Sequence, residues 1–170
     1  KILLFIMETI DKVNKLNKSD FLSIFGNVFE KNEWIAEKTF DFGPFKNFEE
    51  LFFKMIEIFE KAQKISHLKI INSHPELVVE KKLTNESKKE QSDANLNQCS
   101  DEEFKEFKKL NEEYKKKFGF PLVIAVKGKN RKEILDNFKK RISNNIDIEF
   151  KEAKDQVKKI ATFRLNEIIK

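Results

Sequence analysis

Residues 100–119 read SDEEFKEFKKLNEEYKKKFG, and this stretch decides the fold class. Ser100, with Glu103 three residues later, matches a capping box, which marks the start of a helix. Apolar side chains then recur at spacings of three and four, the period of one helix face, before Gly119 supplies a stop signal. The stretch therefore predicts an amphipathic helix with both ends defined. Its apolar positions are Phe104, Phe107, Leu110 and Tyr114.

The same helical pattern recurs on both sides of this stretch. Asn47 can cap a helix with an apolar stripe over residues 48–59, and Asn130 with Glu133 precedes another stripe over residues 134–142. Only four Gly and three Pro interrupt the chain. We therefore predict an all-α fold, a single-domain helical bundle. Three further helices are predicted to open near Ser19, Ser66 and Asp147.

Residues 121–126, with the sequence PLVIAV, break the helical pattern. The run is continuously apolar, too short for a typical helix, and bounded by Pro121 and Gly128. We predict a short buried extended segment here. Backbone groups outside a helix must hydrogen-bond to a neighbour, to water or to a ligand, so this segment is a candidate binding element.

The length of 170 residues suits one domain with a substantial core. We expect a single domain over residues 7–170, with residues 1–6 as an upstream or added segment ahead of a native start at Met7. The lone Cys99 cannot form an intramolecular disulfide, which suits a reducing compartment. The apolar opening run is too short for a membrane span. We therefore expect a cytoplasmic protein.

The net charge of +5 could indicate an anionic partner. Only three of the 34 basic residues are Arg, however, and the lysines are scattered among Asp and Glu. We interpret them as a solvated surface and expect neither nucleic acid nor membrane as a partner. The alternative is a lysine-rich helical interaction module that binds nucleic acid or an acidic protein.

Familiar cofactor and metal motifs are missing from the sequence. It contains no glycine-rich phosphate loop, no His-x-x-x-His pair on a helix, and no serine between glycines in a nucleophile elbow. We therefore expect no cofactor and no metal.

His74 is the more informative of the two histidines. It lies in Ser73-His74-Pro75-Glu76-Leu77, where Pro75 disfavours helical geometry at His74. We expect a helix to end there and to present the imidazole at its terminus. The alternative is a surface or capping histidine, and His67, within an ordinary amphipathic stretch, is interpreted as structural.

A second candidate feature places three hydrogen-bonding side chains and one small residue on one helix face. Ser87, Glu90, Gln91 and Ala94 follow the spacing i, i+3, i+4 and i+7. Such a face could line a polar pocket. A lysine-rich solvated helix would show the same pattern, and Ser87 could equally be a cap.

Arg164 interrupts the apolar stripe of the last predicted helix. The neighbouring stripe positions are Val157, Ile160 and Ile168. A guanidinium there could snorkel to water, pair with a core carboxylate or bind an anionic ligand. Together with His74 and the polar helix face, it would supply an acid/base, hydrogen-bonding groups and a planar cation, a set that suits a small anionic heterocycle.

An ordered series of motifs over nearly the whole chain resembles the 2-oxo-4-hydroxy-4-carboxy-5-ureidoimidazoline (OHCU) decarboxylases. Departures are mild, with Asn95 where glycine is common and Leu122 where an aromatic is common. The series comprises Trp34-Ile35-Ala36-Glu37, Ser73-His74-Pro75-Glu76-Leu77, Ser87-Lys88-Lys89-Glu90-Gln91 with Ala94, residues 107–114, residues 117–124, Arg141, and Arg164-Leu165.

The resemblance implies a cofactor-independent carboxy-lyase that converts OHCU, an anionic small molecule, to (S)-allantoin in urate degradation. It also implies an all-helical fold that is usually dimeric, with His74 as the catalytic acid/base. We expect Glu90 to be catalytic too, by orienting His74 or exchanging protons with it. A family member acting on a different ureido compound is a further alternative. The implied substrate-binding residues are Pro75, Ser87, Gln91, Leu122, Val123, Ile124, Ala125, Val126 and Arg164.

Overall fold

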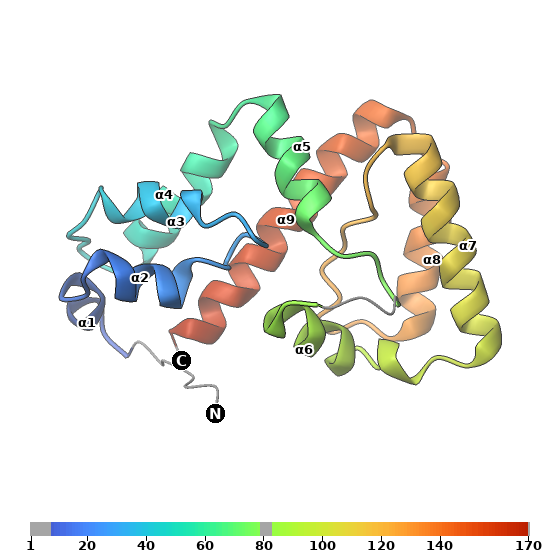
Figure 1. The fold of residues 1–170 in the computed structure, drawn as a ribbon, viewed down its shortest axis with the longest axis horizontal. Helices are drawn as coiled ribbons and strands as arrows, with labels where there is room; N and C mark the ends of the chain where they lie inside the picture. Colours follow the sequence, from blue (N-terminus) through green and yellow to red (C-terminus); the bar gives the residue numbers. More distant parts are fainter. Residues whose placement is uncertain (1–7, 79–82, 170) are drawn as a thin grey trace. The chain divides into compact units, whose positions relative to one another are not determined.

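A computed structural model describes residues 8–78 and 83–169, and all regular structure within these ranges is helical (Figure 1). The all-α prediction is confirmed. Contacts divide the chain into two compact units: unit 1 comprises Lys1–Ser73 and Lys158–Lys170, and unit 2 comprises His74–Val157. A single domain over residues 7–170 stays a prediction, and its expected start at Met7 lies outside the described residues.

Unit 1 is built on phenylalanine packing. Helix α2 packs against α3, and α3 against α4. The ring centroids of Phe29 and Phe59 lie 5.1 Å apart, and those of Phe21 and Phe25 lie 4.6 Å apart. Each of these buried rings contributes about 1.5–3 kcal/mol through removal from water. The unit contains α1 (Ile10–Asn14), α2 (Lys18–Phe25), α3 (Trp34–Phe40), α4 (Phe48–Glu60), α5 (Lys64–Ser73) and the end of α9 (Ile146–Ile168).

Two helix ends in unit 1 follow the predicted local signals. The side-chain oxygen of Asn47 accepts a hydrogen bond from the Glu50 N–H at 2.8 Å, which caps α4 as expected. Helix α5 ends at Ser73, as the proline two residues later requires.

Two predicted helix starts in this unit are wrong by one to three residues. Asn17, not Ser19, caps α2, because its amide oxygen accepts from the Asp20 N–H at 2.8 Å. Helix α5 begins at Lys64, so Ser66 lies within the first turn. At α2, Asn17 and Ser19 are both able to cap, and the Asn17 side chain is the one that accepts from an N–H of the first turn.

Unit 2 has an aromatic core centred on Tyr114. The centroid of its ring lies 4.6 Å from that of Phe118, 6.1 Å from that of Phe120 and 5.8 Å from that of Phe138. Helix α7 packs along α8 to enclose this cluster. The elements are α6 (Asn85–Asp93), the short 3₁₀ helix η1 (Leu96–Gln98), α7 (Asp101–Phe118), α8 (Arg131–Ile142) and the first part of α9.

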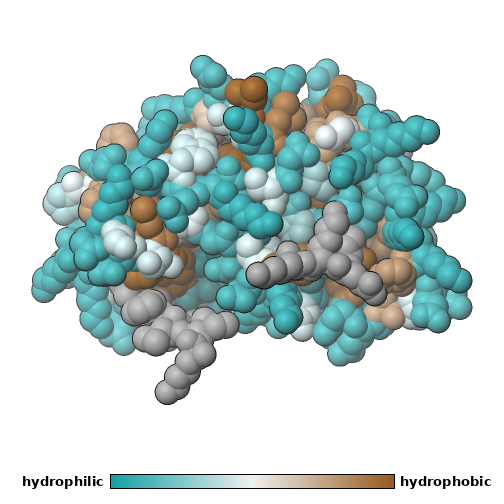
Figure 2. Space-filling model, in the orientation of Figure 1, coloured by the Kyte–Doolittle hydropathy of each residue, from teal (hydrophilic) through white to brown (hydrophobic). Residues whose placement is uncertain are grey.

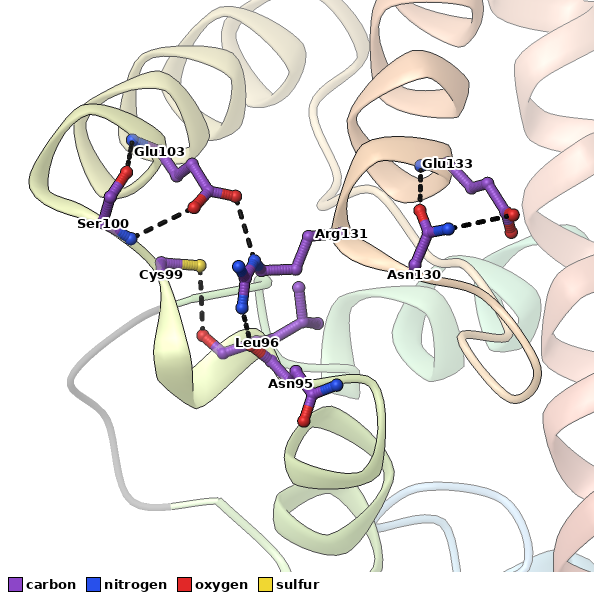
Figure 3. Close-up of polar contacts among 8 residues, drawn as sticks. All are labelled: Asn95, Leu96, Cys99, Ser100, Glu103, Asn130, Arg131 and Glu133. Carbon is purple, nitrogen blue, oxygen red and sulfur yellow. Dashed lines mark hydrogen bonds and ion pairs between the residues drawn. The ribbon is translucent and has the colours of Figure 1, made fainter.

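Reciprocal caps fix the starts of α7 and α8 (Figure 3). Ser100 and Glu103 exchange backbone-to-side-chain hydrogen bonds, both 3.2 Å long. The Asn130 oxygen accepts from the Glu133 N–H at 2.9 Å, and its amide donates to the Glu133 carboxylate at 3.2 Å. Both predicted N-termini are therefore confirmed.

Arg131 links the start of α8 to the first turn of α7 and to the chain just after α6 (Figure 3). It donates from Nε to Glu103 at 3.0 Å and from Nη1 to the Asn95 carbonyl at 3.2 Å. Asn95 has φ +58°, the left-handed conformation that Gly and Asn tolerate best. Asparagine is thus a residue that tolerates the backbone conformation at this position.

The start of α9 differs from the prediction. Asn145 caps it by accepting from the Ile148 N–H at 2.9 Å, and the helix begins at Ile146. Asp147 lies in the first turn, where its carboxylate still interacts favourably with the positive end of the helix dipole.

Residues 121–126 run without a helix, turn or bend, and each is buried. The predicted buried extended segment is confirmed. Gly119 and Gly128 flank it with φ of +78° and +77°, conformations that favour glycine.

Hydrophilic residues cover most of the face shown in Figure 2, with smaller apolar patches between them. This is the distribution expected for solvated lysines and glutamates. Within the described ranges, no helix combines the length and apolar character needed to cross a membrane.

Candidate functional site

His74 is the first residue after α5 and is buried, with 6% of its surface exposed. Pro75 beside it is half-buried. The predicted helix end is confirmed, but the imidazole lies inside the protein rather than at the surface. The imidazole is therefore not the exposed surface histidine of the alternative interpretation.

The polar face of α6 is an inner face. Ser87 and Gln91 are buried, Glu90 is half-buried, and Lys88 between them is exposed. Thr84 caps the helix by accepting from the Ser87 N–H at 3.3 Å, so Ser87 lies in the first turn and is not the cap. The face is therefore directed into unit 2 rather than into solvent.

Two buried amides hold the loop that follows α5. Gln91 accepts from the Val78 N–H at 3.2 Å and donates to the Glu76 carbonyl at 3.3 Å. From α7, Asn111 donates to the Leu77 carbonyl at 2.8 Å. Helices α6 and α7 thus fix three consecutive residues just beyond the histidine and proline. Sequence reasoning missed Asn111, although a polar residue beside a strong apolar stripe was a usable signal.

The buried extended segment is held by side chains from α8 and α9. Arg141 donates from Nη1 to the Val123 carbonyl at 2.5 Å. Gln156 accepts from the Ala125 N–H at 2.9 Å. At Val123 and Ala125, the segment therefore has the neighbouring partners that a non-helical backbone requires.

A buried ion pair supports this arrangement. Arg141 donates from Nε to Glu149 at 2.6 Å and approaches the same carboxylate with Nη2 at 2.5 Å. Tyr114 also donates to Glu149, and Asn144 donates to its second oxygen at 3.1 Å. Burial, reinforced by the hydrogen bond to Glu149, holds the pKa of the Tyr114 phenol well above its usual range, so the hydroxyl keeps its proton.

Sequence reasoning assigned no role to this cluster. Arg141 lies three residues after Phe138 and seven after Ile134, which are both buried on α8. That spacing places its guanidinium on the inner face of the helix, and it was the available signal.

Arg164 lies in unit 1, on the end of α9. Its Nη2 lies 2.8 Å from Glu30, and its Nη1 donates to the Asn27 carbonyl at 2.8 Å. Both members of the ion pair are buried. Of the alternatives, snorkelling to water is therefore wrong, and pairing with a core carboxylate is observed. A role in binding substrate stays a prediction.

His67 serves the core of unit 1. Its Nε2 lies 2.6 Å from the Phe59 carbonyl oxygen, and its ring packs edge-on against the Phe59 ring at 4.8 Å between centroids. The structural interpretation of this histidine fits these contacts.

The residues of the proposed site are distributed over both units. Unit 2 carries the proposed acid/base, the polar face of α6 and the extended segment, whereas unit 1 carries Arg164. The members in unit 2 are His74, Pro75, Ser87, Glu90, Gln91, Leu122, Val123, Ile124, Ala125 and Val126.

This combination defines a small protein whose described residues form only helices as regular structure, with a buried histidine after α5 and a buried polar face on α6. The chain belongs to the OHCU decarboxylase family, whose model matches residues 14–166. The 2-oxo-4-hydroxy-4-carboxy-5-ureidoimidazoline decarboxylase of Haloferax volcanii is 35% identical over 94% of this chain and 95% of its own length.

Two further relatives are longer proteins. The uric acid degradation bifunctional protein of Bacillus sp. (strain TB-90) is 42% identical over 96% of this chain, and that of Bacillus subtilis is 35% identical over the same share. The chain spans 33% of the length of each. Among solved structures, an OHCU decarboxylase in the presence of (S)-allantoin matches with TM-score 0.70 and 25% identity, over 84% of this chain and 94% of that one.

Proposed function

We propose that the chain catalyses the cofactor-independent decarboxylation of OHCU to (S)-allantoin in urate degradation. The observation that carries this proposal is the burial of His74 at the end of α5, in a unit that also buries the polar face of α6. The choice of OHCU as the substrate rests on membership of the OHCU decarboxylase family over residues 14–166.

The substrate brings its own electron sink. Its carboxylate is attached to a ring carbon that also bears a hydroxyl, and the adjoining ring carbon is doubly bonded to nitrogen. When the bond to the carboxylate breaks, CO₂ leaves and the electron pair moves toward that nitrogen. One proton then adds at the ureido-bearing carbon and one at the ring nitrogen, and the hydroxyl releases its proton as it becomes the carbonyl of allantoin. The reaction consumes one proton and needs neither oxidant nor reductant.

The protein must therefore place a proton on one face of a bound intermediate. His74 is the proposed acid/base, a role worth roughly 10²- to 10⁴-fold in rate. Glu90, half-buried on the inner side of α6, would orient it or exchange protons with it. Fixed orientation allows protonation from one side only, which would give a single enantiomer.

The remaining groups would bind and orient the substrate. Ser87 and Gln91 offer hydrogen bonds from the buried face of α6, and Pro75 would form part of the pocket wall. The backbone of residues 122–126 would hold the ring amides and the ureido group. Arg164 would donate to a substrate oxygen while Glu30 keeps its guanidinium in place.

We further propose a cytoplasmic homodimer, on the basis of the family resemblance and the single cysteine. In unit 1, the apolar side chains of Phe53 and Ile65 are 69% and 61% exposed, and a second copy could cover them. Sedimentation at micromolar concentration would distinguish a dimer from a monomer.

A lysine-rich interaction module is the second candidate function. Unit 1 has an open cavity of about 810 Å³ whose lining includes Lys38, Lys54, Lys61 and Lys69. Glu57, however, lies 2.6 Å from both Lys54 and Lys61, and these hydrogen bonds lower its pKa to about 2. The carboxylate therefore stays charged and offsets part of the basic character, which weakens the case for binding a polyanion.

Freshly prepared product of urate oxidation is the substrate that tests the proposed function. We expect the protein to accelerate the appearance of (S)-allantoin, followed by its optical activity, over the spontaneous reaction that gives racemic product. Acceleration with another ureido compound alone would favour the different-substrate alternative. Binding to DNA that weakens steeply with salt, without any acceleration, would favour the interaction module.

Exhaustive chelation should leave the activity unchanged. The physical reason is that the imine nitrogen of the substrate accepts the electrons released on decarboxylation. The measurement is the initial rate before and after dialysis against a strong chelator, with no organic cofactor added. Loss of rate that one added metal restores would contradict this prediction.

A further inference from the structure

Two side chains hold the extended segment at residues 121–126 along one edge, and at its end the Val126 carbonyl accepts from the Lys129 N–H at 3.0 Å. Arg141 and Gln156 bind the backbone of two residues that are two positions apart, Val123 and Ala125. In an extended chain the backbone N–H and C=O groups of successive residues point to opposite edges. The groups of residues 123 and 125 therefore share one edge, and those of residues 122 and 124 point to the other.

The second edge carries polar groups that need partners. Leu122 and Ile124 are 2% and 6% exposed, so their backbone groups lie away from bulk water. Among the described residues, no hydrogen bond is formed by the backbone N–H or C=O of either one. Buried backbone groups are almost always satisfied, which marks this edge as a place for a ligand.

We propose that Arg141 and Gln156 are positioning residues that hold the backbone of Leu122 and Ile124 toward the substrate. This inference rests on the proposed function. Neither side chain need touch the substrate. Each would prevent the segment from rotating about its own axis. A rotation that broke the bonds to Val123 and Ala125 would also turn the backbone groups of Leu122 and Ile124 away from the substrate.

The anchors are themselves held firmly. Gln156 donates from Nε2 to Glu152 at 2.8 Å, which orients its oxygen toward the Ala125 N–H. The guanidinium of Arg141 is fixed by the buried carboxylate of Glu149. A backbone edge held in this way presents alternating donors and acceptors, the complement of a ring amide or a ureido group.

Gln156→Met tests the role of the second anchor, since it keeps the size of the side chain but removes the acceptor for the Ala125 N–H. We expect KM for OHCU to rise at least tenfold while kcat changes less than threefold, because binding rather than proton transfer is disturbed. Gln98→Met, at an exposed glutamine, is the matched control and should leave both constants unchanged. A merely structural role would lower the amount of active protein and leave KM alone.

An exchange of partners provides the rescue. In the double variant Glu152→Gln/Gln156→Glu, the new carboxylate can accept from both the Ala125 N–H and the new amide, with no change in net charge. We expect it to restore KM to within about threefold of the wild type, whereas Gln156→Glu alone, which repels Glu152, should not. If Gln156→Met fails to fold, the KM values of Gln156→Glu and of the double variant test the positioning role of Gln156 instead.

Hydrogen exchange separates this inference from the proposed function. The Ala125 amide should exchange at least tenfold faster in Gln156→Met than in the wild type or the Gln98→Met control. A wild type inactive on OHCU would overturn the proposed function, and the Ala125 exchange rate would still test the anchor. Unchanged KM in Gln156→Met, unchanged Ala125 exchange, or a double variant no better than Gln156→Glu would overturn the positioning role.

Discussion

His74→Asn should remove the enzymatic increment in (S)-allantoin formation, a loss of roughly 10²- to 10⁴-fold. Asparagine keeps a polar side chain of moderate size but cannot take up and release a proton near neutral pH. Because the position lies beyond the end of α5 and asparagine is also polar, the change should alter helical content and melting temperature little. The measurement is the initial rate of optically active allantoin formation with freshly prepared substrate.

His67→Asn is the matched control. That imidazole contacts the Phe59 ring and carbonyl in unit 1, so we expect a lower melting temperature but an unchanged rate per folded molecule. Wild-type turnover in the His74 variant, or an equal loss of turnover in both variants, would contradict the assigned acid/base.

Arg164→Met should destabilise the protein by about 3–5 kcal/mol, because it leaves the buried carboxylate of Glu30 without its cation. For a chain of this size the melting temperature should fall by on the order of 10 °C. Arg131→Met, which breaks a half-buried ion pair with Glu103, is the control and should cost much less. Thermal unfolding followed by circular dichroism measures both changes.

The double variant Glu30→Met/Arg164→Met separates the two proposed roles of Arg164. Removing both charges together should restore most of the lost stability, since apolar side chains of similar size can replace a buried ion pair. If Arg164 donates to the substrate, kcat/KM should stay at least tenfold below the wild type, a loss of about 1.4 kcal/mol. Recovery of both stability and kcat/KM would show that Arg164 is structural only.

Helix ends could be predicted where one residue carried an unambiguous local signal. Ser100 and Asn130 cap a helix start, and Gly119 ends a helix, through hydrogen bonds to residues three or four positions away. The spacing in the sequence was therefore sufficient to predict these ends. The starts at Asn17 and Asn145 were missed, because a second cap-competent residue follows each within two positions. Which residue becomes the cap depends on where packing begins the helix.

The candidate site could be predicted only in part. The buried face of α6 and the end of α5 at Ser73 follow from local periodicity and from the steric effect of proline. The anchors of the extended segment do not, because Arg141 meets Val123 across 18 residues and Gln156 meets Ala125 across 31. Such partners are chosen by tertiary packing, which no local spacing encodes.

The pairing of Arg164 with Glu30 shows the same limit. The sequence indicated that a cation within an apolar stripe needs a partner, and three kinds of partner remained open. The observed carboxylate lies far away in the chain, in the loop between α2 and α3. Burial of both side chains identifies this pair only once the fold is known.

The most direct test of the proposed decarboxylation is the joint release of CO₂ and (S)-allantoin from OHCU labelled in its carboxylate. With wild-type protein, labelled CO₂ and (S)-allantoin should appear in equal amounts, at initial rates proportional to protein concentration and well above the spontaneous rate. His74→Asn should return both rates to the spontaneous level, with racemic product. Release of CO₂ at the spontaneous rate regardless of protein concentration, or racemic allantoin from the wild type, would contradict the account.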